Sequence, residues 1–353
     1  MEQPVGAIPW DQVGPGWILA TWDEGPATPV GEPHTPSPTT LYLVNPIGGR
    51  YAIRTFAADT PVGLDDWSGD GRRALLTAYG TGGGPTTVIE VDLTNGQTIH
   101  SQRVTTTPET KFQYTRPYGR AVLATIQPPQ LVGPLTFERT DTSGAVQLVY
   151  ATQSRAVGSF QGGVLSTPDG TELILGAQTG LIEMSNDGHL VGTSTLPTSS
   201  GVPCSPHRWW TIGVVLASCG GPLYLVPLSG GTPTQLTAPL TGRGPDLGDL
   251  DAWKLDSGTF VQAASGCGDV YLAKLNPDGT TTPVMVPDVD NSGTVLVVGA
   301  HDELLAIQAK LACGGGVALV WYNPTINTTN LILGPPLNGG GVANAILFRD
   351  PNT

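Results

Sequence analysis

The sequence predicts an all-β protein, a seven-bladed β-propeller in which each blade is a sheet of four antiparallel strands. Three observations predict it: short apolar segments alternate with Gly, Asn and Asp turns, one such segment recurs about every 46 residues, and seven of these units nearly fill the 353 residues. A fixed period of this length is typical of repeat architectures such as propellers.

The composition favours many short strands joined by tight turns. The chain has 48 Gly and 32 Pro, only 13% charged residues, and 39% hydrophobic residues. The hydrophobic residues lie in short blocks rich in Val, Leu, Ile and Thr, which is typical of strands. Asp-Gly and Asn-Gly turns between them suit hairpins because these residues tolerate positive φ.

The repeat is most visible in seven similar segments, such as Leu41-Tyr-Leu-Val-Asn-Pro and Leu223-Tyr-Leu-Val-Pro-Leu. They start at residues 41, 88, 135, 181, 223, 270 and 318, so the intervals are 47, 47, 46, 42, 47 and 48 residues. We interpret the whole chain, 1–353, as a single domain. Its expected blades are 16–56 plus 341–349, 64–104, 111–151, 160–196, 204–237, 249–287 and 295–334.

The first blade lacks its innermost strand at the N-terminal end of the chain. Residues 342–348, Val-Ala-Asn-Ala-Ile-Leu-Phe, form a strand-like segment that no other blade needs. Pairing this C-terminal strand into the first blade would close the ring and remove two exposed strand edges.

The four cysteines predict two disulfides. Cys219, Cys267 and Cys313 occupy the turn between the second and third strands of blades 5, 6 and 7, and Cys204 precedes the first strand of blade 5. All four therefore lie at one end of the ring, called the upper face below. We predict the pairs Cys204–Cys219, within blade 5, and Cys267–Cys313, between blades 6 and 7.

Two disulfides predict an oxidising, extracytoplasmic compartment, either the cell envelope or the medium. No signal peptide is visible at Met1-Glu2-Gln3-Pro4, so we expect a mature exported form to which Met1 was added. A cytosolic protein with four unreactive thiols is the alternative.

The turn-strand pattern resembles the TolB-like and WD40-like propellers of bacteria. The segments that carry this resemblance are Trp67-Ser-Gly-Asp-Gly-Arg-Arg-Ala-Leu-Leu and Leu41-Tyr-Leu-Val-Asn-Pro with Gly48-Gly49. The resemblance implies a propeller architecture; because TolB itself has six blades and an additional N-terminal domain, its partners are not carried over. The Gly-, Pro- and Thr-rich, Lys-poor usage looks like a high-GC actinobacterium, where such propellers occur as exported proteins.

The net charge of −13 argues against nucleic acid and against an anionic membrane surface as partners. The sequence has no apolar run of 18 residues, so no membrane insertion is expected. A protein or glycan partner is compatible with this charge, and the chain is expected to be a monomer.

Acidic residues near the predicted starts of innermost strands suggest an acidic upper mouth of the axial channel, where a single-sign charge attracts cations and basic partners. His207 and Arg208, followed by Trp209 and Trp210, form an aromatic and basic cluster near the axis. The tryptophans are interpreted mainly as packing between blades. The candidate partner-binding residues are Asp65, Asp66, His207, Arg208, Asp246, Asp249 and Asp251. Asp residues also suit turns, so a purely structural role is the alternative.

The segment Asp288-Val-Asp290-Asn-Ser292-Gly293 matches the start of a calcium loop, and Asp288, Asp290 and Ser292 are its candidate ligands. The twelfth position is Gly299, where a calcium loop has a closing acidic residue, so a polar turn is the alternative. Apart from this possible calcium, no cofactor is expected.

One long departure from the repeat is the Pro-rich segment 23–40 in blade 1. It lengthens a turn on the upper face by about a dozen residues, and it is expected to be extended. This arm could bind a partner, cover the channel or be a tolerated insertion.

No catalytic residue is nominated, because the five His are scattered and no Gly-x-Ser-x-Gly motif appears. The sequence thus predicts an exported, non-catalytic binding or scaffold propeller that uses its upper face. The alternative is an extracellular polysaccharide hydrolase or lyase using acidic residues at the channel mouth.

Overall fold

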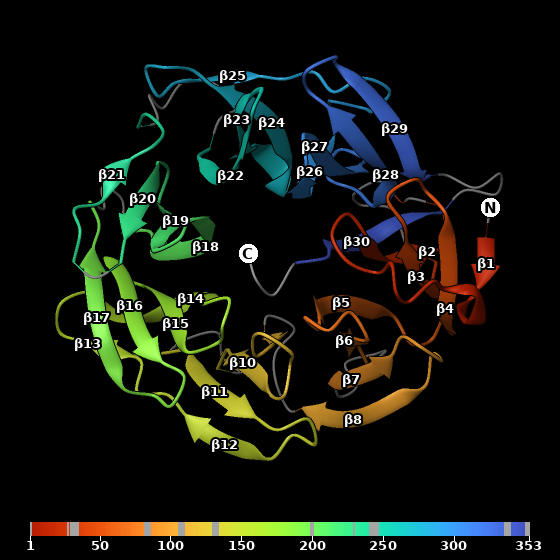
Figure 1. Cartoon of the computed structure of the whole chain (residues 1–353), viewed down its shortest axis with the longest axis horizontal. Helices are drawn as coiled ribbons and strands as arrows, with labels where there is room; N and C mark the ends of the chain where they lie inside the picture. Colours follow the sequence, from red (N-terminus) through yellow and green to blue (C-terminus); the bar gives the residue numbers. More distant parts are fainter. Residues whose placement is uncertain are drawn as a thin grey trace.

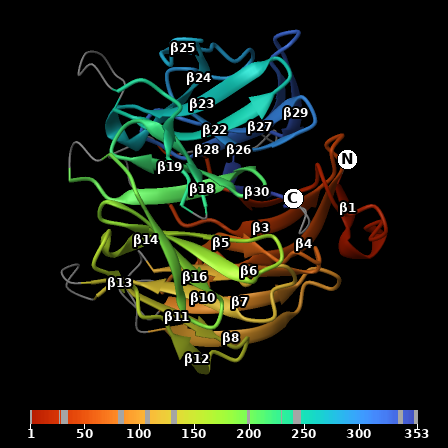
Figure 2. The ribbon, with the colours of Figure 1, turned by 60° about the vertical axis from the view of Figure 1, so that its left-hand side comes forward.

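The chain forms a ring of seven four-stranded antiparallel blades around a central axis, as the sequence predicts (Figure 1). This computed structural model describes residues 2–26, 28, 35–80, 86–104, 110–128, 134–197, 201–228, 230–239, 247–334 and 340–349. Seen obliquely, neighbouring blades pack face to face (Figure 2).

In blades 2 to 7 the four strands run outward from the axis in chain order, and in blade 1 the innermost strand comes from the C-terminal end of the chain. From blade 1 to blade 7, the innermost strands are β30 (Gly341–Leu347), β5 (Val62–Trp67), β9 (Lys111–Tyr114), β14 (Gly158–Ser166), β18 (Cys204–Thr211), β22 (Asp249–Leu255) and β26 (Thr294–His301). The second strands are β2 (Ile18–Asp23), β6 (Arg73–Ala78), β10 (Val122–Ile126), β15 (Glu172–Ala177), β19 (Val214–Cys219), β23 (Gly258–Ala264) and β27 (Leu304–Lys310).

The third strands contain the seven repeat segments found in the sequence. They are β3 (Thr39–Val44), β7 (Thr86–Asp92), β11 (Thr136–Thr140), β16 (Gly180–Ser185), β20 (Leu223–Pro227), β24 (Val270–Leu275) and β28 (Gly316–Asn323). The outermost strands are β4 (Arg50–Phe56), β8 (Thr98–Val104), β12 (Val146–Val149), β17 (Leu190–Thr195), β21 (Thr234–Gln235), β25 (Thr281–Pro283) and β29 (Thr328–Leu333).

The C-terminal strand closes the ring. β30 pairs antiparallel with β2, so that Leu347 lies opposite Ile18 and Val342 lies opposite Trp22. Blade 1 therefore combines the two ends of the chain, which confirms the closure predicted from residues 342–348. β30 itself runs inward and ends near the axis (Figure 1).

Two short strands extend blades in a way that the sequence does not reveal. β1 (Glu2–Pro4) pairs in parallel with β4, and β13 (Gln153–Ser154) pairs with β14. Both are polar and at most three residues long, so they lack the apolar alternation that identifies a strand. Two 3₁₀ turns, η1 (Val5–Ala7) and η3 (Gly266–Gly268), are also present. No helix in the described residues is long and apolar enough to cross a membrane.

The core lies between adjacent blades, where the apolar faces of their sheets meet. Between blades 6 and 7, for example, Phe260 and Leu272 pack with Val295 and Ile307. A buried glutamine ties the same two blades together, because the Gln262 amide donates to the Val295 carbonyl at 2.9 Å and accepts from the Val297 N–H at 2.7 Å. Burial of these apolar faces is the main stabilising contribution, and the glutamine fixes their register.

The topology defines two faces of the ring. The upper face carries the turns between second and third strands and the connections between blades, and the lower face carries the other turns.

Both predicted disulfides are present, at the upper ends of blades 5 to 7. Cys204 on β18 lies directly opposite Cys219 on β19. Cys267 in η3 is joined to Cys313 in the turn between β27 and β28. Asp269 supports this second bridge, since its carboxylate accepts hydrogen bonds from the Cys313 N–H at 3.0 Å and from the Thr294 hydroxyl at 2.6 Å.

Candidate functional site

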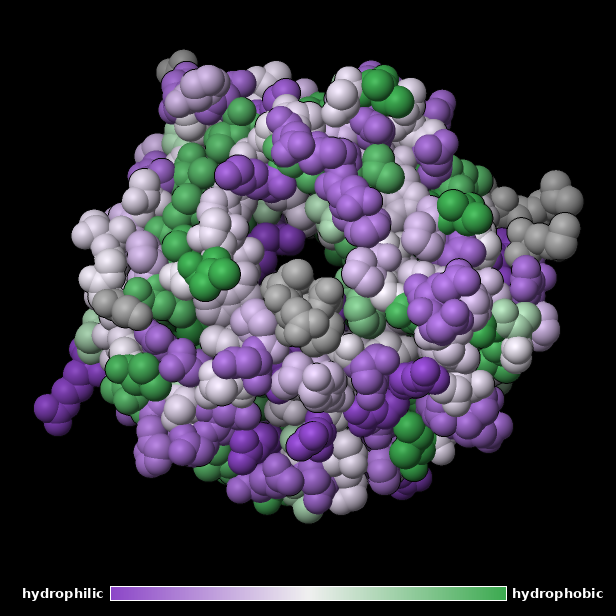
Figure 3. All heavy atoms as spheres, in the orientation of Figure 1, coloured by the Kyte–Doolittle hydropathy of each residue, from purple (hydrophilic) through white to green (hydrophobic). Residues whose placement is uncertain are grey.

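The axial channel is lined by innermost strands that contain β-bulges. In five of them the pairing with the second strand skips a residue, namely Ala343, Asp65, His207, Leu250 and Val298, and β18 skips Trp210 as well. A bulge locally twists the strand and re-aims its side chains, so polar residues can face the axis while their neighbours stay in the core. The molecule is visibly hollowed at its axis (Figure 3).

Asp66 is part of a buried ion pair between blades 2 and 3. The residue is 5% exposed, and its carboxylate accepts hydrogen bonds from the Tyr114 N–H at 2.8 Å and the Arg116 guanidinium at 3.2 Å. Arg116 also donates to the Trp67 carbonyl at 3.3 Å. Asp66 is thus fully engaged in joining the two blades.

Asp251 has the equivalent role between blades 5 and 6. The Arg208 Nε donates to Asp251 Oδ1 at 2.7 Å, and Arg208 Nη2 donates to the other carboxylate oxygen. The guanidinium lies over the Trp253 ring, 4.3 Å from its centroid. Bidentate pairing and stacking both suit the planar guanidinium, so Arg208 is held in one orientation.

The candidate aspartates therefore do not form the free acidic mouth expected from the sequence. Asp65 and Asp66 lie in the lower half of β5, not near its start, because this strand begins at Val62. Asp249 does lie at the upper start of β22, but it is buried. Asp246 lies outside the described residues. Two of the carboxylates, Asp66 and Asp251, are neutralised by arginines.

Asp65 differs from Asp66 and Asp251, because no arginine neutralises it among the described residues. Its carboxylate accepts a hydrogen bond from the Thr77 hydroxyl at 2.6 Å. Burial raises the pKa of Asp65 to about 7, and the nearby negative charge of Asp66 contributes to the rise, while the Thr77 hydrogen bond opposes it. Asp65 therefore takes up or loses its proton close to neutral pH.

Replacing Asp65 with Asn should stabilise the protein at alkaline pH. The pKa of this carboxyl is higher in the folded state than in the unfolded state. The free energy of unfolding therefore falls as the pH rises from about 4 to about 7. The full shift corresponds to about 4 kcal/mol. Because channel water screens the partly exposed side chain, we expect a gain of about 2 kcal/mol at pH 8.5 and none at pH 4.

Urea unfolding at both pH values measures this effect, with the exposed turn residue Asp256 replaced by Asn as the control. Equal unfolding free energies of wild type and Asp65→Asn at pH 8.5 would show that Asp65 is not held in a charge-disfavouring environment.

A cavity of about 420 Å³ opens at the lower mouth of the channel. It is bounded by Pro15 and Gly16, by His207–Trp209 on β18, by Val298–Asp302 at the end of β26, and by Leu165 and Leu347–Arg349. Phe348 is fixed there, since its N–H donates to the Trp17 carbonyl at 2.8 Å and its ring packs edge-on against Trp67, 5.0 Å away.

Arg349 follows Phe348 and is the notable cation of this cavity. Its side chain is exposed and forms part of the cavity wall. It makes no hydrogen bond or ion pair with the described residues. An arginine does not deprotonate in proteins, so a positive charge stays at this cavity.

His207 contacts Ser218, a pair that the sequence spacing did not indicate. The imidazole Nε2 and the Ser218 hydroxyl are 2.7 Å apart, and burial lowers the pKa of His207, so the ring is neutral at pH 7. A Ser–His pair resembles an activated nucleophile only when a third group orients the imidazole. Both oxygens of the nearby Asp251 carboxylate bind Arg208 instead.

The tryptophans of this segment pack between blades, as the sequence suggested. The Trp209 indole donates to the Ser166 carbonyl of blade 4 at 2.9 Å, and Trp210 packs against the cluster between blades 5 and 6. Trp67 and Trp253 are buried. These rings position the strand that carries His207 and Arg208 rather than facing a ligand together.

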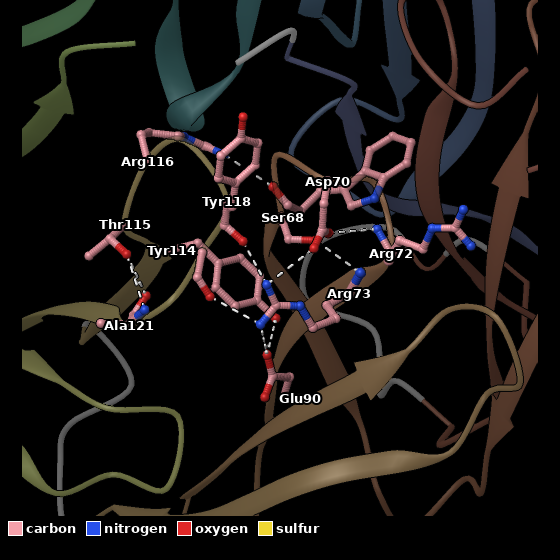
Figure 4. A network of polar contacts seen from close by, with 12 residues as sticks. Ser68, Asp70, Arg72, Arg73, Glu90, Tyr114, Thr115, Arg116, Tyr118 and Ala121 are labelled. Atoms are coloured by element: carbon pink, nitrogen blue, oxygen red, sulfur yellow. Dashed lines mark hydrogen bonds and ion pairs between the residues drawn. The ribbon is translucent and has the colours of Figure 1, made fainter. Parts of the chain in front are cut away.

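A second arginine network joins blades 2 and 3 at the lower face (Figure 4). Arg73 pairs with Glu90 at 3.1 Å and donates to the Tyr118 and Gly119 carbonyls at 2.6 and 3.0 Å. The Tyr114 hydroxyl donates to the same Glu90 carboxylate at 3.1 Å. Arg73 therefore holds the turn that contains Arg116, and so helps to place the Arg116–Asp66 pair beside the channel.

The candidate calcium ligands turn toward other partners. Asp288 Oδ2 accepts a hydrogen bond from Thr329 on the outermost strand β29 at 2.8 Å, so this carboxylate lies at the periphery and not at the mouth. Asp290 Oδ1 accepts from the Ser292 N–H and hydroxyl at 2.9 and 2.6 Å. Within the described ranges, no three His, Cys, Asp or Glu side chains are grouped in a way that could hold a metal ion.

The Pro-rich segment 23–40 is described at both ends, whereas residues 27 and 29–34 lie outside the described part. Asp23 accepts hydrogen bonds from the Gly25 N–H, at 2.9 Å, and from the Ser37 hydroxyl, which joins the two ends of the arm. The Thr28 carbonyl accepts from the Gly315 N–H of blade 7 at 3.4 Å. Binding of a partner by the 23–40 arm stays a prediction.

Comparisons with known proteins identify the fold. No protein-family model matches the sequence, and no curated protein matches it. The fold is similar to that of TolB from Acinetobacter baumannii, at 14% identity and a TM-score of 0.50 over 94% of this chain and 66% of TolB.

Two further structures show the range of proteins that contain such a ring. The Cps50 (Swd1) β-propeller domain from Myceliophteria thermophila has 12% identity and a TM-score of 0.51 over 78% of this chain and 88% of the domain. Prolyl oligopeptidase B from Galerina marginata has 10% identity and a TM-score of 0.54 over 87% of this chain and 48% of the peptidase. Such identities establish the fold alone: this chain is similar to TolB-like and WD40-like β-propellers.

Proposed function

We propose that the chain is an exported, non-catalytic binding propeller that holds a protein partner at the mouth of its axial channel. The observation that supports the proposal is that the charged groups beside the axis differ in whether they have a partner. The carboxylates Asp66 and Asp251 are committed to ion pairs between blades, whereas the cavity of about 420 Å³ presents Arg349 without a partner among the described residues. Cavities with a few convergent polar groups are typical binding sites.

Export is supported by the two disulfides, since such bonds persist in oxidising compartments. A rigid ring suits a binding role, because cross-links and buried ion pairs at several blade interfaces keep the channel geometry fixed. Propellers occur both in enzymes and in proteins without catalytic activity, so the fold itself assigns neither role.

The enzyme alternative requires two carboxyl groups that a glycan can reach from both sides of its scissile bond. Asp65, with its raised pKa, could act as an acid, but its neighbour Asp66 is buried beneath Arg116. Assays with acidic and neutral polysaccharides should show no cleavage. Turnover that Asp65→Asn abolishes would favour the hydrolase or lyase, and fluorophosphonate labelling of Ser218 would favour a serine hydrolase.

Site-specific photo-crosslinking in the producing cell tests the binding proposal and its face. A benzophenone side chain at Ile212, which is fully exposed in the lower-face turn after β18, should form an adduct with one protein species. The same group at Leu250, which is 40% exposed at the upper end of β22, probes the opposite mouth. Adducts from Leu250 alone would restore the upper face as the contact surface, and adducts from neither position would contradict the proposal.

A further inference from the structure

A second cavity, of about 450 Å³, lies at the lower face between blades 3 and 4. Blade 3 contributes the turn between β9 and β10, together with Arg139 on β11 and Gln147 on β12. Blade 4 contributes the two turns that contain Asp169 and Asn186. None of these residues lines the axial cavity. Volumes of roughly 300–1,000 Å³ are typical of sites for small molecules.

Arg139 is a half-buried cation of this cavity, and it is anchored through one nitrogen only. Its Nη1 donates to the main-chain and side-chain oxygens of Asn186 at 2.7 and 3.1 Å. Its Nε is buried without a hydrogen-bond partner, and the guanidinium forms no ion pair with a described carboxylate. A buried, unpaired donor on a charged group is costly, so an anion beside the free Nη2 would stabilise Arg139.

The other charged groups of the cavity favour a ligand with one negative charge. Arg116 is already paired between the blades, whereas the exposed Arg120 has no ion pair among the described residues. Asp169 supplies one carboxylate, and hydrogen bonds from Thr167 and Thr171 lower its pKa, so it is ionised at neutral pH. The two unpaired arginines therefore exceed the carboxylates of the wall by one charge, which fits a monoanion better than a phosphate dianion.

The remaining groups of the wall suit a sugar ring. The side-chain oxygen of Asn186 accepts from Arg139, so its amide nitrogen remains as a donor. Gln147 can donate and accept, and Asp169 can accept a hydrogen bond from a hydroxyl. Tyr118 is 51% exposed and adds an aromatic ring, against which the C–H face of a pyranose can pack.

The turns that form the cavity are fixed within the protein itself. Arg73 donates to the Tyr118 and Gly119 carbonyls at 2.6 and 3.0 Å (Figure 4). Gly170 has a φ of +74°, and a Cβ atom there would collide with the Arg116 carbonyl oxygen, so glycine lets the turns of blades 3 and 4 meet. A cavity formed in advance loses little conformational entropy when it binds a ligand.

We propose that this cavity binds a uronic acid, a sugar whose ring carries one carboxylate. Arg139 donates to the carboxylate, Arg120 adds positive charge at the rim, and the two amides and Asp169 bind the hydroxyl groups. A glutamate side chain of a protein would use the arginines, but it would leave the hydroxyl-binding groups and the Tyr118 ring without contacts. This inference goes beyond the proposed function, because it concerns a separate cavity and another ligand.

Isothermal titration of the full chain tests the inference with the methyl glycosides of D-glucuronic and D-galacturonic acid. Methyl glucoside and methyl galactoside are the matched probes that lack the carboxylate. We expect saturable binding of at least one uronide, at least tenfold tighter than that of its neutral counterpart. Arg139→Gln should weaken this binding at least tenfold. Arg155→Gln, which changes an exposed arginine of blade 4 outside the cavity, should bind within twofold of wild type.

Tyr118→Ala provides a second variant in case Arg139→Gln does not fold. The described hydrogen bonds of Tyr118 involve only its main chain, so the replacement should leave the urea midpoint unchanged. Uronide binding should nevertheless weaken at least threefold, because the ring surface is lost.

Four results would overturn the inference. These are no saturable binding of either uronide, equal binding of the neutral glycosides, undiminished binding to Arg139→Gln or Tyr118→Ala, and equally tight binding of inorganic phosphate or of N-acetylated, C-amidated glutamate. Tighter binding of a methyl uronide than of the free uronic acid identifies the end of a glycan as the occupant, and the reverse identifies the free acid.

Discussion

Replacing Asp66 with Ala should lower the free energy of unfolding by about 3 to 5 kcal/mol, the typical cost of removing one partner of a buried ion pair. Asp66 is 5% exposed, and its loss leaves both the Arg116 guanidinium and the Tyr114 N–H without their acceptor. Urea titration followed by tryptophan fluorescence measures the effect, because Trp67 is the adjacent residue.

A double-mutant cycle separates the ion pair from packing. Asp66→Leu with Arg116→Met removes both charges, so it should destabilise less than either single replacement, because no uncompensated charge is left in the wall. A loss below about 1 kcal/mol for Asp66→Ala would mean that water reaches the pair, and that Asp66 is available for a partner after all.

Removing the Cys267–Cys313 disulfide should destabilise the protein by about 4 kcal/mol. The bridge spans 46 residues and joins blade 6 to blade 7, so it restricts a long loop of the unfolded chain. The Cys204–Cys219 bridge spans 15 residues within one blade, and the same argument gives about 3 kcal/mol.

Paired Cys→Ser variants of each bridge, compared by urea unfolding under non-reducing conditions, check this order. A larger loss from the Cys204/Cys219 pair than from the Cys267/Cys313 pair would contradict the loop argument. It would point instead to packing, since Cys204 and Cys219 are both buried and Cys267 and Cys313 are not.

The architecture could be predicted from sequence because each blade repeats the same local pattern. The third strands gave the period, and the innermost strand missing from blade 1 led directly to residues 342–348. The cysteine pairs followed from strand order alone. By contrast, β1 consists of three exposed residues without an apolar pattern. It forms a strand only because the outer edge of β4 offers it a pairing partner.

The chemistry of the axis could be predicted only in part. The sequence identified Asp65, Asp66, His207, Arg208 and Asp251, but not the pairing that decides what they do. Arg116 lies 50 residues beyond Asp66, in a turn whose path depends on Arg73. Bulges such as that at Asp65 shift the register by one residue, and local sequence does not fix them.

Arg349 is not among the residues predicted from the sequence, although its position contains a signal. It comes two residues after the end of the closing strand β30, so its place beside the axis follows from the predicted closure. Its lack of a partner among the described residues depends on the arginine–aspartate pairs of four other blades, which no local pattern reveals.

The most direct test of the central claim, that a partner binds at the axial cavity through Arg349, is the Ile212 photo-adduct measured in an Arg349→Gln background. The account predicts that the adduct is lost while the urea midpoint stays unchanged, because Arg349 stabilises no described contact. An adduct of undiminished yield would contradict it.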